Sequence, residues 1–331
     1  MIDQNILIFG GSGSLGKTFI DRHISQNQIT NYSRDEWKHW QMDYKVKNKN
    51  LINVIGDIRD HHRVKEVIKR ANPHIIIIAS ALKHIERVEY SVHESIKTNL
   101  AGVQNVLDGV ESNRNVLTNL KKVVFVSTDK ACSPVNVYGM CKALSEKFMI
   151  EKAFFIPEID FVICRYGNVL NSKGSIIPLL HKIGSSIEHP FYTITHPEMT
   201  RFVMTLDESC KLIEYTLQYG ESGDIVIPKL PSMWIRDLIS IFSELYNKPV
   251  ISGKIRYGEK ISETLINETQ SFYVRDEEQH YFLTAPHKGN SFNNNVTPFS
   301  YSSSSHPITK SQLHNYLKSM EMLNKEFNEM E

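Results

Sequence analysis

The chain has 331 residues, of which 41% are hydrophobic and 23% charged, so it is long enough for a nucleotide-binding domain with a smaller second domain. A formal net charge of +1 gives no overall basic field and argues against nucleic acid or an anionic membrane as a partner. The four cysteines have neither CxxC spacing nor suitably spaced histidines, and no apolar run approaches the roughly 20 residues of a membrane span, so we expect a cytoplasmic protein with reduced thiols and no metal.

A glycine-rich turn follows the first predicted strand. Residues 5–9 are continuously apolar, and Gly10, Gly13 and Gly16 then give GxxGxxG spacing before a predicted helix over residues 17–24. Such glycines allow a tight turn and a close approach of the backbone to a pyrophosphate, which the helix N-terminus faces. A glycine triplet alone is weak evidence, but the strand before it and the helix after it indicate a dinucleotide site.

Residues 29–33 form the second predicted strand, which ends in a Ser-Arg-Asp-Glu turn. In dinucleotide-binding folds an acidic residue at this place selects NAD, whereas an arginine accommodates the 2′-phosphate of NADP. Arg34, preceded by the hydroxyl of Ser33, therefore favours NADP, although a solvated turn arginine would give the same sequence. Asp35 could instead face a ribose.

The third predicted strand, residues 51–55, precedes Asp57 and Ile58, and a short amphipathic helix over residues 63–70 follows. At a strand tip this pair could flank an adenine ring. An aspartate that serves only the turn is an equal alternative.

The fourth predicted strand, residues 74–79, is nearly all isoleucine, as burial on both faces demands. It leads into residues 79–84, where small side chains would let a cofactor's phosphates and ribose lie against the backbone. A long predicted helix over residues 93–112 contains Asn99, a further candidate for cofactor binding.

The stretch STDKACSPVNVYGMCK, residues 127–142, follows a fifth apolar strand over residues 123–126. Tyr138 and Lys142 are four residues apart, which places them on one face of a helix. An unperturbed phenol titrates near ~10, so a neighbouring cation would favour the phenolate at neutral pH. A hydroxyl, a carboxylate and a second amine lie at the strand's end, where parallel sheets keep their ligand sites: Thr128, Asp129 and Lys130.

Strand and helix alternate five times over this first half, which predicts an α/β fold with a Rossmann-like, doubly wound parallel sheet and right-handed crossovers. A sixth strand over residues 161–164 follows, and then the regular order is lost until a helix over residues 206–219 returns to the composition of the first half. We therefore expect residues 1–166 and about 200–226 to bind NADP, and about 167–199 and 227–331 to form a smaller, discontinuous α/β substrate domain.

Within the second half the pattern predicts four further segments. These are a strand over residues 224–227, a helix over about 235–246, an irregular Asn- and Ser-rich loop over residues 290–305, and a C-terminal helical pattern over residues 308–327.

Several motifs occur in one order at suitable spacing: GGSGSLGK, YSRDE, GDIRD, ALKH, STDKA, RYGNV, MTRF and GEK with a glutamate three residues on. Together they resemble the extended short-chain dehydrogenase/reductase family, and within it the UDP-N-acetylglucosamine 4,6-dehydratases that invert C5 in polysaccharide biosynthesis. The resemblance covers residues 3–320. It departs from the family pattern at Cys141, where a small residue is usual, and His196 has no evident role.

The resemblance implies a role for each site residue. Tyr138 and Lys142 would be the hydride-transfer pair, Thr128 would hydrogen-bond the sugar O4, Asp129 would protonate the departing C6 hydroxyl, and Lys130 would be the base at C5. The cofactor-binding residues would be Gly10, Ser12, Gly13, Ser14, Leu15, Gly16, Ser33, Arg34, Asp57, Ile58, Ala79, Ala81, Lys83, Asn99, Tyr138 and Lys142. The substrate-binding residues would be Lys83, Asn168, Ser175, Arg201, Arg256 and Glu259.

This chemistry sets two opposite requirements on adjacent residues. Lys130 can abstract a proton only when it is neutral, which requires burial or a neighbouring cation to lower its pKa from ~10.4. Asp129 must be protonated, which requires an apolar or crowded site to raise its pKa. The competing interpretation is a turn ion pair that only orders the loop, and for the arginines it is ordinary surface charge.

Two other functions fit the same fold. A UDP-sugar epimerase or reductase would share Tyr138 and Lys142 but would not need Asp129 and Lys130. A regulatory protein that senses NADP without turnover would have no reason to keep the tyrosine and lysine together. The resemblance also implies UDP-N-acetylglucosamine as the substrate and a homo-oligomer, with a hexamer as one form.

Overall fold

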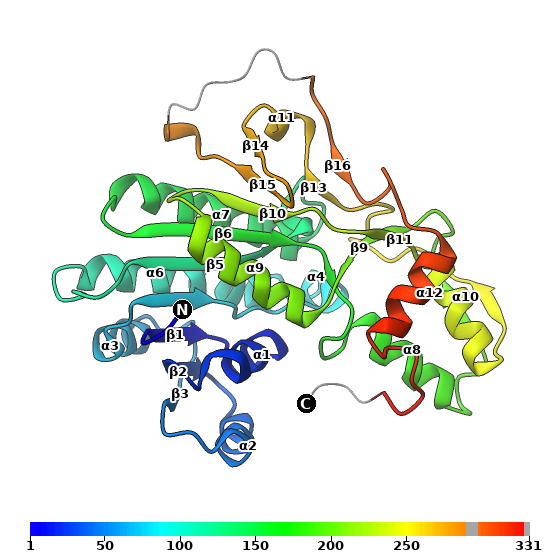
Figure 1. Ribbon diagram of the computed structural model, residues 1–331, viewed down its shortest axis with the longest axis horizontal. Coiled ribbons are helices and arrows are strands. Elements are labelled where there is room, and N and C mark those ends of the chain that lie inside the picture. The colour runs from blue at the N-terminus through cyan, green and yellow to red at the C-terminus, as the bar shows by residue number, and fades with distance from the viewer. Residues whose placement is uncertain (289–296, 328–331) are drawn as a thin grey trace.

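The computed structural model describes residues 1–288 and 297–327. In that part of the chain, nine strands form one sheet in the order β14-β15-β10-β6-β5-β4-β1-β2-β3 (Figure 1). Seven neighbouring strands, which pair in parallel, are β1 (Asn5–Phe9), β2 (Gln28–Ser33), β3 (Leu51–Ile55), β4 (Ile75–Ile78), β5 (Lys122–Thr128), β6 (Asp160–Tyr166) and β10 (Ile225–Pro228). The predicted doubly wound α/β sheet is confirmed.

Burial on both faces explains why the central strands are continuously apolar. In β1, Leu7 and Phe9 face a core with α3 and α6, whereas Ile6 and Ile8 face a second core with α1 and α9. The other strands alternate in the same way because successive side chains of a strand point to opposite faces. β1 pairs with both β2 and β4, so the order of strands reverses beside β1. At such a reversal the carboxyl ends of the strands leave a crevice for a ligand.

The helices of this half cover the two faces of the sheet (Figure 1). Their bounds are α1 (Ser14–His23), α2 (Glu36–Val46), α3 (His61–Ala71), α4 (Ile85–Glu89), α5 (Val92–Ser95), α6 (Gly102–Asn113), α7 (Val137–Phe155) and α9 (Leu206–Tyr219). The helix predicted over residues 93–112 contains a π-helical segment, η1 (Ile96–Ala101), which carries Asn99. The pattern gave no sign of α2, whose N-terminus Asp35 caps by accepting a hydrogen bond from the Lys38 N–H.

A smaller unit lies beside the carboxyl ends of the strands, at the right of Figure 1. Its apolar core joins α8 (Ile176–Ser185), α10 (Ile235–Tyr246) and α12 (Lys310–Ser319). Three small sheets complete this half: β7 (Asn168–Val169) with β9 (Thr200–Met204) and β11 (Ser232–Trp234); β8 (Tyr192–Ile194) with β12 (Val250–Ser252); and β13 (Thr264–Ile266) with β16 (Tyr301–Ser302).

Three expectations for the second half differ from the structure. The strand β15 (His280–Leu283) joins the large sheet as the antiparallel neighbour of β10, and β14 (Val274–Asp276) pairs antiparallel with β15 at the edge, although residues 227–331 were all expected in the second domain. In the expected loop over 290–305, residues 290–296 lie outside the described residues, and Tyr301–Ser302 is a strand rather than a loop. The helical pattern over 308–327 gives a helix only over Lys310–Ser319, followed by turns.

In the described ranges, 1–288 and 297–327, no helix is both long and apolar enough to cross a membrane. The same residues include no group of three His, Cys, Asp or Glu side chains placed to hold a metal ion. The four cysteines are buried and free.

Candidate active site

The glycine-rich turn has the geometry that the sequence predicts. Gly10 has φ +93°, and a Cβ at this position would lie 2.8 Å from the backbone nitrogen of Ser80. A Cβ on Gly16 would lie 2.4 Å from the Cα of Gly11, so α1 packs this closely on the turn only because residue 16 is glycine. Gly13 precedes the first turn of α1 without a side-chain cap, which leaves backbone N–H groups at this helix end for an anion.

A cleft of about 590 Å³ runs from this turn to the end of β5. Most of the predicted residues line it: Gly10, Ser12, Gly13, Ser14, Leu15, Gly16, Ala79, Ala81, Lys83, Thr128, Lys130, Tyr138, Lys142, Asn168 and Ser175. Lys17, Lys38 and Gln41 also line it, and the sequence reasoning missed them. A lysine four residues after Arg34 was the available signal for Lys38. The lining fits a dinucleotide because the glycines pack closely and because the N-terminus of α1 has no side-chain cap.

Several other predicted residues lie behind the lining rather than in it. The Asn99 amide donates to the Leu82 carbonyl at 2.9 Å and accepts from the Leu82 N–H at 2.7 Å, so it fixes the loop after β4. Ile58 is buried against Gly102, where a Cβ would lie 2.8 Å from its Cγ2 atom. Asn99 therefore acts on the cleft through Leu82, which lines it.

The residues at the tips of β2 and β3 form a polar cluster. The Ser33 hydroxyl lies 2.6 Å from His39 Nε2, and Arg34 is exposed with its guanidinium 3.8 Å from the Asp57 carboxylate. Arg59 binds that carboxylate at 2.6 Å. Burial works to raise the pKa of Asp57, but the Arg59 hydrogen bonds outweigh it and lower the pKa.

Tyr138 and Lys142 both reach the cleft from the first turns of α7. Asn136 caps this helix by accepting from the Gly139 N–H at 2.8 Å. The Lys142 amine donates to the Val126 carbonyl at 2.7 Å and lies 4.4 Å from the centre of the Phe125 ring. Burial lowers the pKa of Lys142 to about 8.

The expected lowering of the Tyr138 pKa by Lys142 is wrong for this structure. Burial raises the pKa of Tyr138 to about 12, and the groups that oppose this rise are the Lys130 ammonium and a hydrogen bond to Thr128. The physical reason is that the Lys142 amine turns toward the end of β5, a contact that helical spacing does not reveal.

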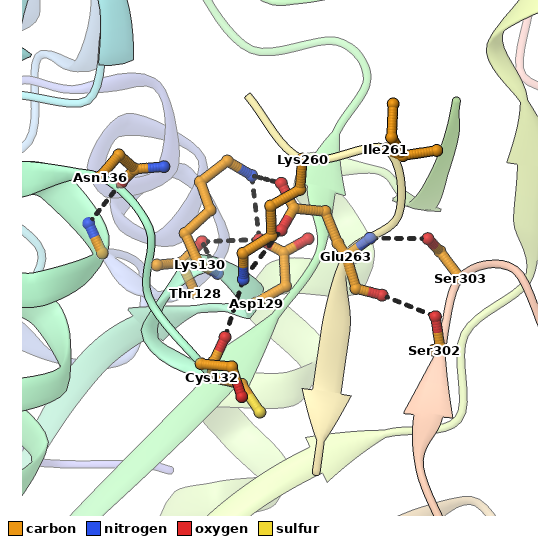
Figure 2. Close-up of polar contacts among 12 residues, drawn as sticks. Thr128, Asp129, Lys130, Cys132, Asn136, Lys260, Ile261, Glu263, Ser302 and Ser303 are labelled. Carbon is orange, nitrogen blue, oxygen red and sulfur yellow. Dashed lines mark hydrogen bonds and ion pairs between the residues drawn. The ribbon is translucent and has the colours of Figure 1, made fainter. Parts of the chain in front are cut away.

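Asp129 and Lys130 form a buried cluster with Glu263 (Figure 2). Asp129 is fully buried, and its Oδ1 accepts from Thr128 Oγ1 at 2.9 Å and from Lys130 Nζ at 3.0 Å. Lys130 Nζ also lies 3.2 Å from Glu263 Oε1. A turn ion pair that only orders a loop would be solvated, whereas these groups are enclosed.

The charges of this cluster meet one of the two chemical requirements. Burial raises the pKa of Asp129, and Glu263 adds to the rise against the opposing effect of Lys130. Burial works to lower the pKa of Lys130, but the two carboxylates outweigh it and the pKa is raised. Asp129 is thus biased toward the acid form as expected. The expected lowering of the Lys130 pKa is wrong because both neighbours are acidic.

Sequence reasoning missed Glu263, although the signal was present as the last residue of the GEKISE motif, residues 258–263. It missed a second buried pair as well. Arg165 is 1% exposed and binds Glu146 at 2.6 Å, and it also donates to the Leu265 carbonyl of β13 at 2.7 Å. The Ser127 hydroxyl donates to the same Glu146 at 2.5 Å, so this pair ties β13 to the end of β5.

The predicted substrate residues divide into two groups. Asn168 and Ser175 line the cleft together with Lys83, whose amine donates to the Lys173 carbonyl at 2.8 Å. Arg201, Arg256 and Glu259 do not line it.

Arg201 is only 8% exposed and donates to the Thr200 carbonyl at 2.7 Å, so it is not ordinary surface charge. Arg256 is exposed, and its backbone N–H donates to the Glu259 carboxylate at 3.1 Å.

The two departures from the family pattern have structural roles. Cys141 is buried with its sulfur 3.8 Å from the Ser95 hydroxyl, and His196 accepts from the Glu198 N–H within a turn.

The order of the strands, the glycine-rich turn and the Tyr138 and Lys142 side chains define a Rossmann-type short-chain dehydrogenase/reductase fold. The chain matches the model of the polysaccharide biosynthesis protein family over residues 6–285 and belongs to that family. The resemblance predicted from the motifs is therefore confirmed.

Individual relatives agree with this assignment. A Campylobacter jejuni UDP-N-acetylglucosamine 4,6-dehydratase (inverting) is 35% identical, covering 93% of this chain and 95% of its own. A Rickettsia akari UDP-glucose 4-epimerase is 36% identical, covering 80% and 78%. Among solved structures, Pen from Bacillus thuringiensis is 28% identical with a TM-score of 0.88, covering 97% of this chain and 99% of its own.

Proposed function

We propose that this protein is a C5-inverting UDP-N-acetylglucosamine 4,6-dehydratase, which forms a UDP-2-acetamido-2,6-dideoxy-hexos-4-ulose and water. The observation that carries the proposal is the enclosed Asp129 and Lys130 pair beside Tyr138 at the end of β5. Removal of water from C5 and C6 needs an acid and a base in addition to the hydride-transfer residues. An epimerase needs only the latter.

The cofactor in this proposal is NADP, which would accept a hydride from C4 and return it to C6. The glycine-rich turn and the end of α1 would hold its pyrophosphate, and Arg34 would bind its 2′-phosphate. Support for the phosphate comes from the exposed guanidinium of Arg34 and from Lys38, four residues further on, which lines the cleft. Two cations here suit an additional phosphate better than a ribose hydroxyl.

The residues of the chain would act in two stages. In the first, Tyr138 takes the O4 proton while Thr128 hydrogen-bonds O4, so that a C4 ketone forms. In the second, the ketone acidifies the C5 hydrogen, Lys130 removes this proton, and Asp129 gives its proton to the C6 hydroxyl, which departs as water. Delivery of a proton to the opposite face of C5 then gives inversion.

Asp129 and Lys130 form an ion pair, and they need only exchange one proton to reach the forms that catalysis uses. Lys130 Nζ lies 3.0 Å from Asp129 Oδ1, so a proton can pass between them along an existing hydrogen bond. The transfer converts an ammonium and a carboxylate into a neutral amine and a carboxylic acid, which are the two forms that the second stage uses. Because the groups are coupled, their titration belongs to the pair rather than to either residue.

The assembly and location of the protein are part of the same proposal: a homo-oligomer, with a hexamer as one form, in the cytoplasm. Support for self-association comes from large apolar side chains that are exposed near α5 and on α7, including Tyr90 at 87% and Leu144 at 50%. Light scattering of the purified protein measures the assembly directly.

The test is incubation with UDP-N-acetylglucosamine in deuterated water without added cofactor, followed by NMR of the product. A 4-keto-6-deoxy sugar with deuterium at C5 is the expected result, because copurified NADP is enough for an internal redox cycle. An unlabelled C4 epimer would favour the epimerase, and absence of turnover would favour a sensing protein. Either outcome contradicts the proposal.

A further inference from the structure

Glu263 enters the active site from a distant part of the chain. It lies immediately before β13, and its carboxylate is almost fully buried, with the residue 2% exposed. The Ser303 hydroxyl accepts a hydrogen bond from the Glu263 N–H at 3.0 Å (Figure 2). The Ser303 N–H donates to the Glu263 carbonyl at 2.8 Å, so Ser303 holds the backbone of Glu263 from both sides. The position of the carboxylate is thus fixed by the pairing of β13 with β16.

The two oxygens of this carboxylate face two different lysines. Oε1 lies 3.2 Å from Lys130 Nζ, and Oε2 lies 3.7 Å from Lys260 Nζ. The Lys260 amine itself donates to the Cys132 carbonyl at 2.8 Å. Among the described residues, Oε2 is buried without a hydrogen-bond partner, and so is Oδ2 of Asp129. Buried and incompletely paired carboxylates are costly unless they serve the chemistry.

Two carboxylates therefore share the Lys130 ammonium between them. The other charged or titratable groups that act on the cluster are Lys260 from the loop before β13, Arg201 from β9, Tyr138 from α7 and Arg165 from β6. Two buried carboxylates that contact the same ammonium disfavour each other's ionisation. The cluster thus favours a proton on one of them.

We propose that Glu263 is a positioning residue for the elimination stage, which acts through its neighbours by keeping the proton on Asp129 and holding the Lys130 amine in place. The inference rests on the proposed function. Glu263, like Asp129, lies outside the lining of the cleft, whereas Lys130 lies in it. Because Glu263 Oε1 lies 3.2 Å from Lys130 Nζ, the glutamate acts on the reaction through the lysine. Burial works to raise the pKa of Glu263, but Lys130 and then Arg201 and Lys260 outweigh it and lower the pKa, so Glu263 itself stays ionised.

The experiment compares Glu263→Gln with the wild-type protein. Glutamine keeps the shape of the side chain but removes the negative charge that favours protons on Asp129 and Lys130. Both groups should then lose their protons at lower pH, so the whole pH profile of C5 deuterium incorporation should move to lower pH. At neutral pH we expect elimination to slow by about 10- to 100-fold, as for loss of a group that orients a catalytic residue.

A single-turnover measurement separates this role from general damage. Hydride transfer from C4 depends on Tyr138, on which Lys130 acts only through its charge, so reduced nicotinamide absorbance should still appear, with a rate that falls less than the rate of elimination, and then persist. Glu263→Asp, which keeps the charge, should restore the wild-type pH profile. Glu244→Gln is the matched control, since Glu244 is an exposed residue paired with Lys310 in the second unit.

Should Glu263→Gln fail to fold, Lys260→Met carries the test with the opposite sign. Lys130 and Arg201, which lower the pKa of Glu263 more than Lys260 does, still keep Glu263 ionised in this variant. Without the cation that faces Oε2, the negative charge of Glu263 acts more strongly on Asp129 and Lys130, so the pH profile should move to higher pH.

Three outcomes would overturn the inference. One is a Glu263→Gln profile that coincides with that of the wild type, with hydride transfer and elimination slowed equally. Another is a Lys260→Met profile that does not move to higher pH. The third is a wild-type protein that makes no labelled 4-keto sugar, which would overturn the proposed function together with the inference, whereas the first two leave the proposed function intact.

Discussion

The amine of Lys142 donates a hydrogen bond to the carbonyl oxygen of Val126 at 2.7 Å, so the lysine is anchored to the end of the strand β5 rather than to Tyr138. The sign of its effect on stability follows from burial, which lowers its pKa from 10.5 to about 8 in the folded protein. Between these values the unfolded chain binds more protons than the folded one, so the free energy of unfolding rises with pH across this window. Below pH 8 the cost of the buried charge is present in full.

Lys142→Met should therefore abolish turnover yet stabilise the protein at pH 7. The shift in pKa corresponds to about 3 kcal/mol, and loss of the bond to Val126 offsets about 1 kcal/mol of it, which leaves a net gain of about 2 kcal/mol. The gain should shrink as pH rises from 8 to 10.5. Urea unfolding at several pH values measures it, with exposed Lys147→Met as control. A destabilised Lys142→Met at pH 7 would contradict the argument.

Asp129→Asn should block water loss while hydride transfer continues. The amide cannot supply a proton to the C6 hydroxyl, so elimination should fall by about 10²- to 10⁴-fold, the usual contribution of a general acid. Reduced nicotinamide should accumulate on addition of UDP-N-acetylglucosamine, as followed by absorbance. Tyr138→Phe is the comparison, because it should prevent the reduced form from appearing at all. Equal loss of both signals in Asp129→Asn would remove the aspartate from its assigned role.

Arg34→Ala should weaken NADP binding far more than NAD binding. A charge-assisted guanidinium contact to a phosphate contributes about 1.5–3 kcal/mol, which corresponds to a loss of roughly 10- to 150-fold in affinity for NADP alone. Calorimetric titration with each cofactor measures the ratio. Arg63→Ala, which removes an arginine paired with Glu66 on α3, should leave both affinities unchanged. Parallel losses for NADP and NAD would argue against the 2′-phosphate contact.

Glu146→Gln should destabilise the fold because it leaves the Arg165 guanidinium buried without its counter-charge. Breaking one partner of a buried ion pair costs about 3–5 kcal/mol, whereas replacing both partners by apolar side chains costs much less. The double variant Glu146→Leu with Arg165→Met should thus be more stable than Glu146→Gln. Denaturant unfolding decides the order, and Glu158→Gln in the exposed pair with Arg114 should change stability by less than about 1 kcal/mol.

The parallel sheet was predictable because its strands are buried on both faces and therefore read as unbroken apolar runs, as in β1 and β4. The helices α9 and α10 begin and end at the predicted residues. By contrast, α2 was missed because its three large aromatic residues, Trp37, Trp40 and Tyr44, stack on one another at the surface and give no apolar face toward the core.

The candidate site was predictable only where one local stretch contains it. Thr128, Asp129, Lys130 and Tyr138 lie close together in sequence, whereas Glu263 reaches Lys130 through the path of β13. The charge states of Asp129 and Lys130 depend on the position of Glu263. The sequence reasoning, which did not include Glu263, required a lowered pKa for Lys130. Tertiary contacts, and not residue spacing, thus decide which proton each group carries.

The antiparallel pairing of β15 with β10 anchors residues 274–283 to the edge of the sheet that β10 has already reached. The intervening segment, which carries α10 and Glu263, therefore leaves one sheet edge and returns to the same edge. The second unit is therefore joined to the large sheet at both ends of this segment. The two halves should accordingly melt as one cooperative unit, with a single calorimetric transition in place of two.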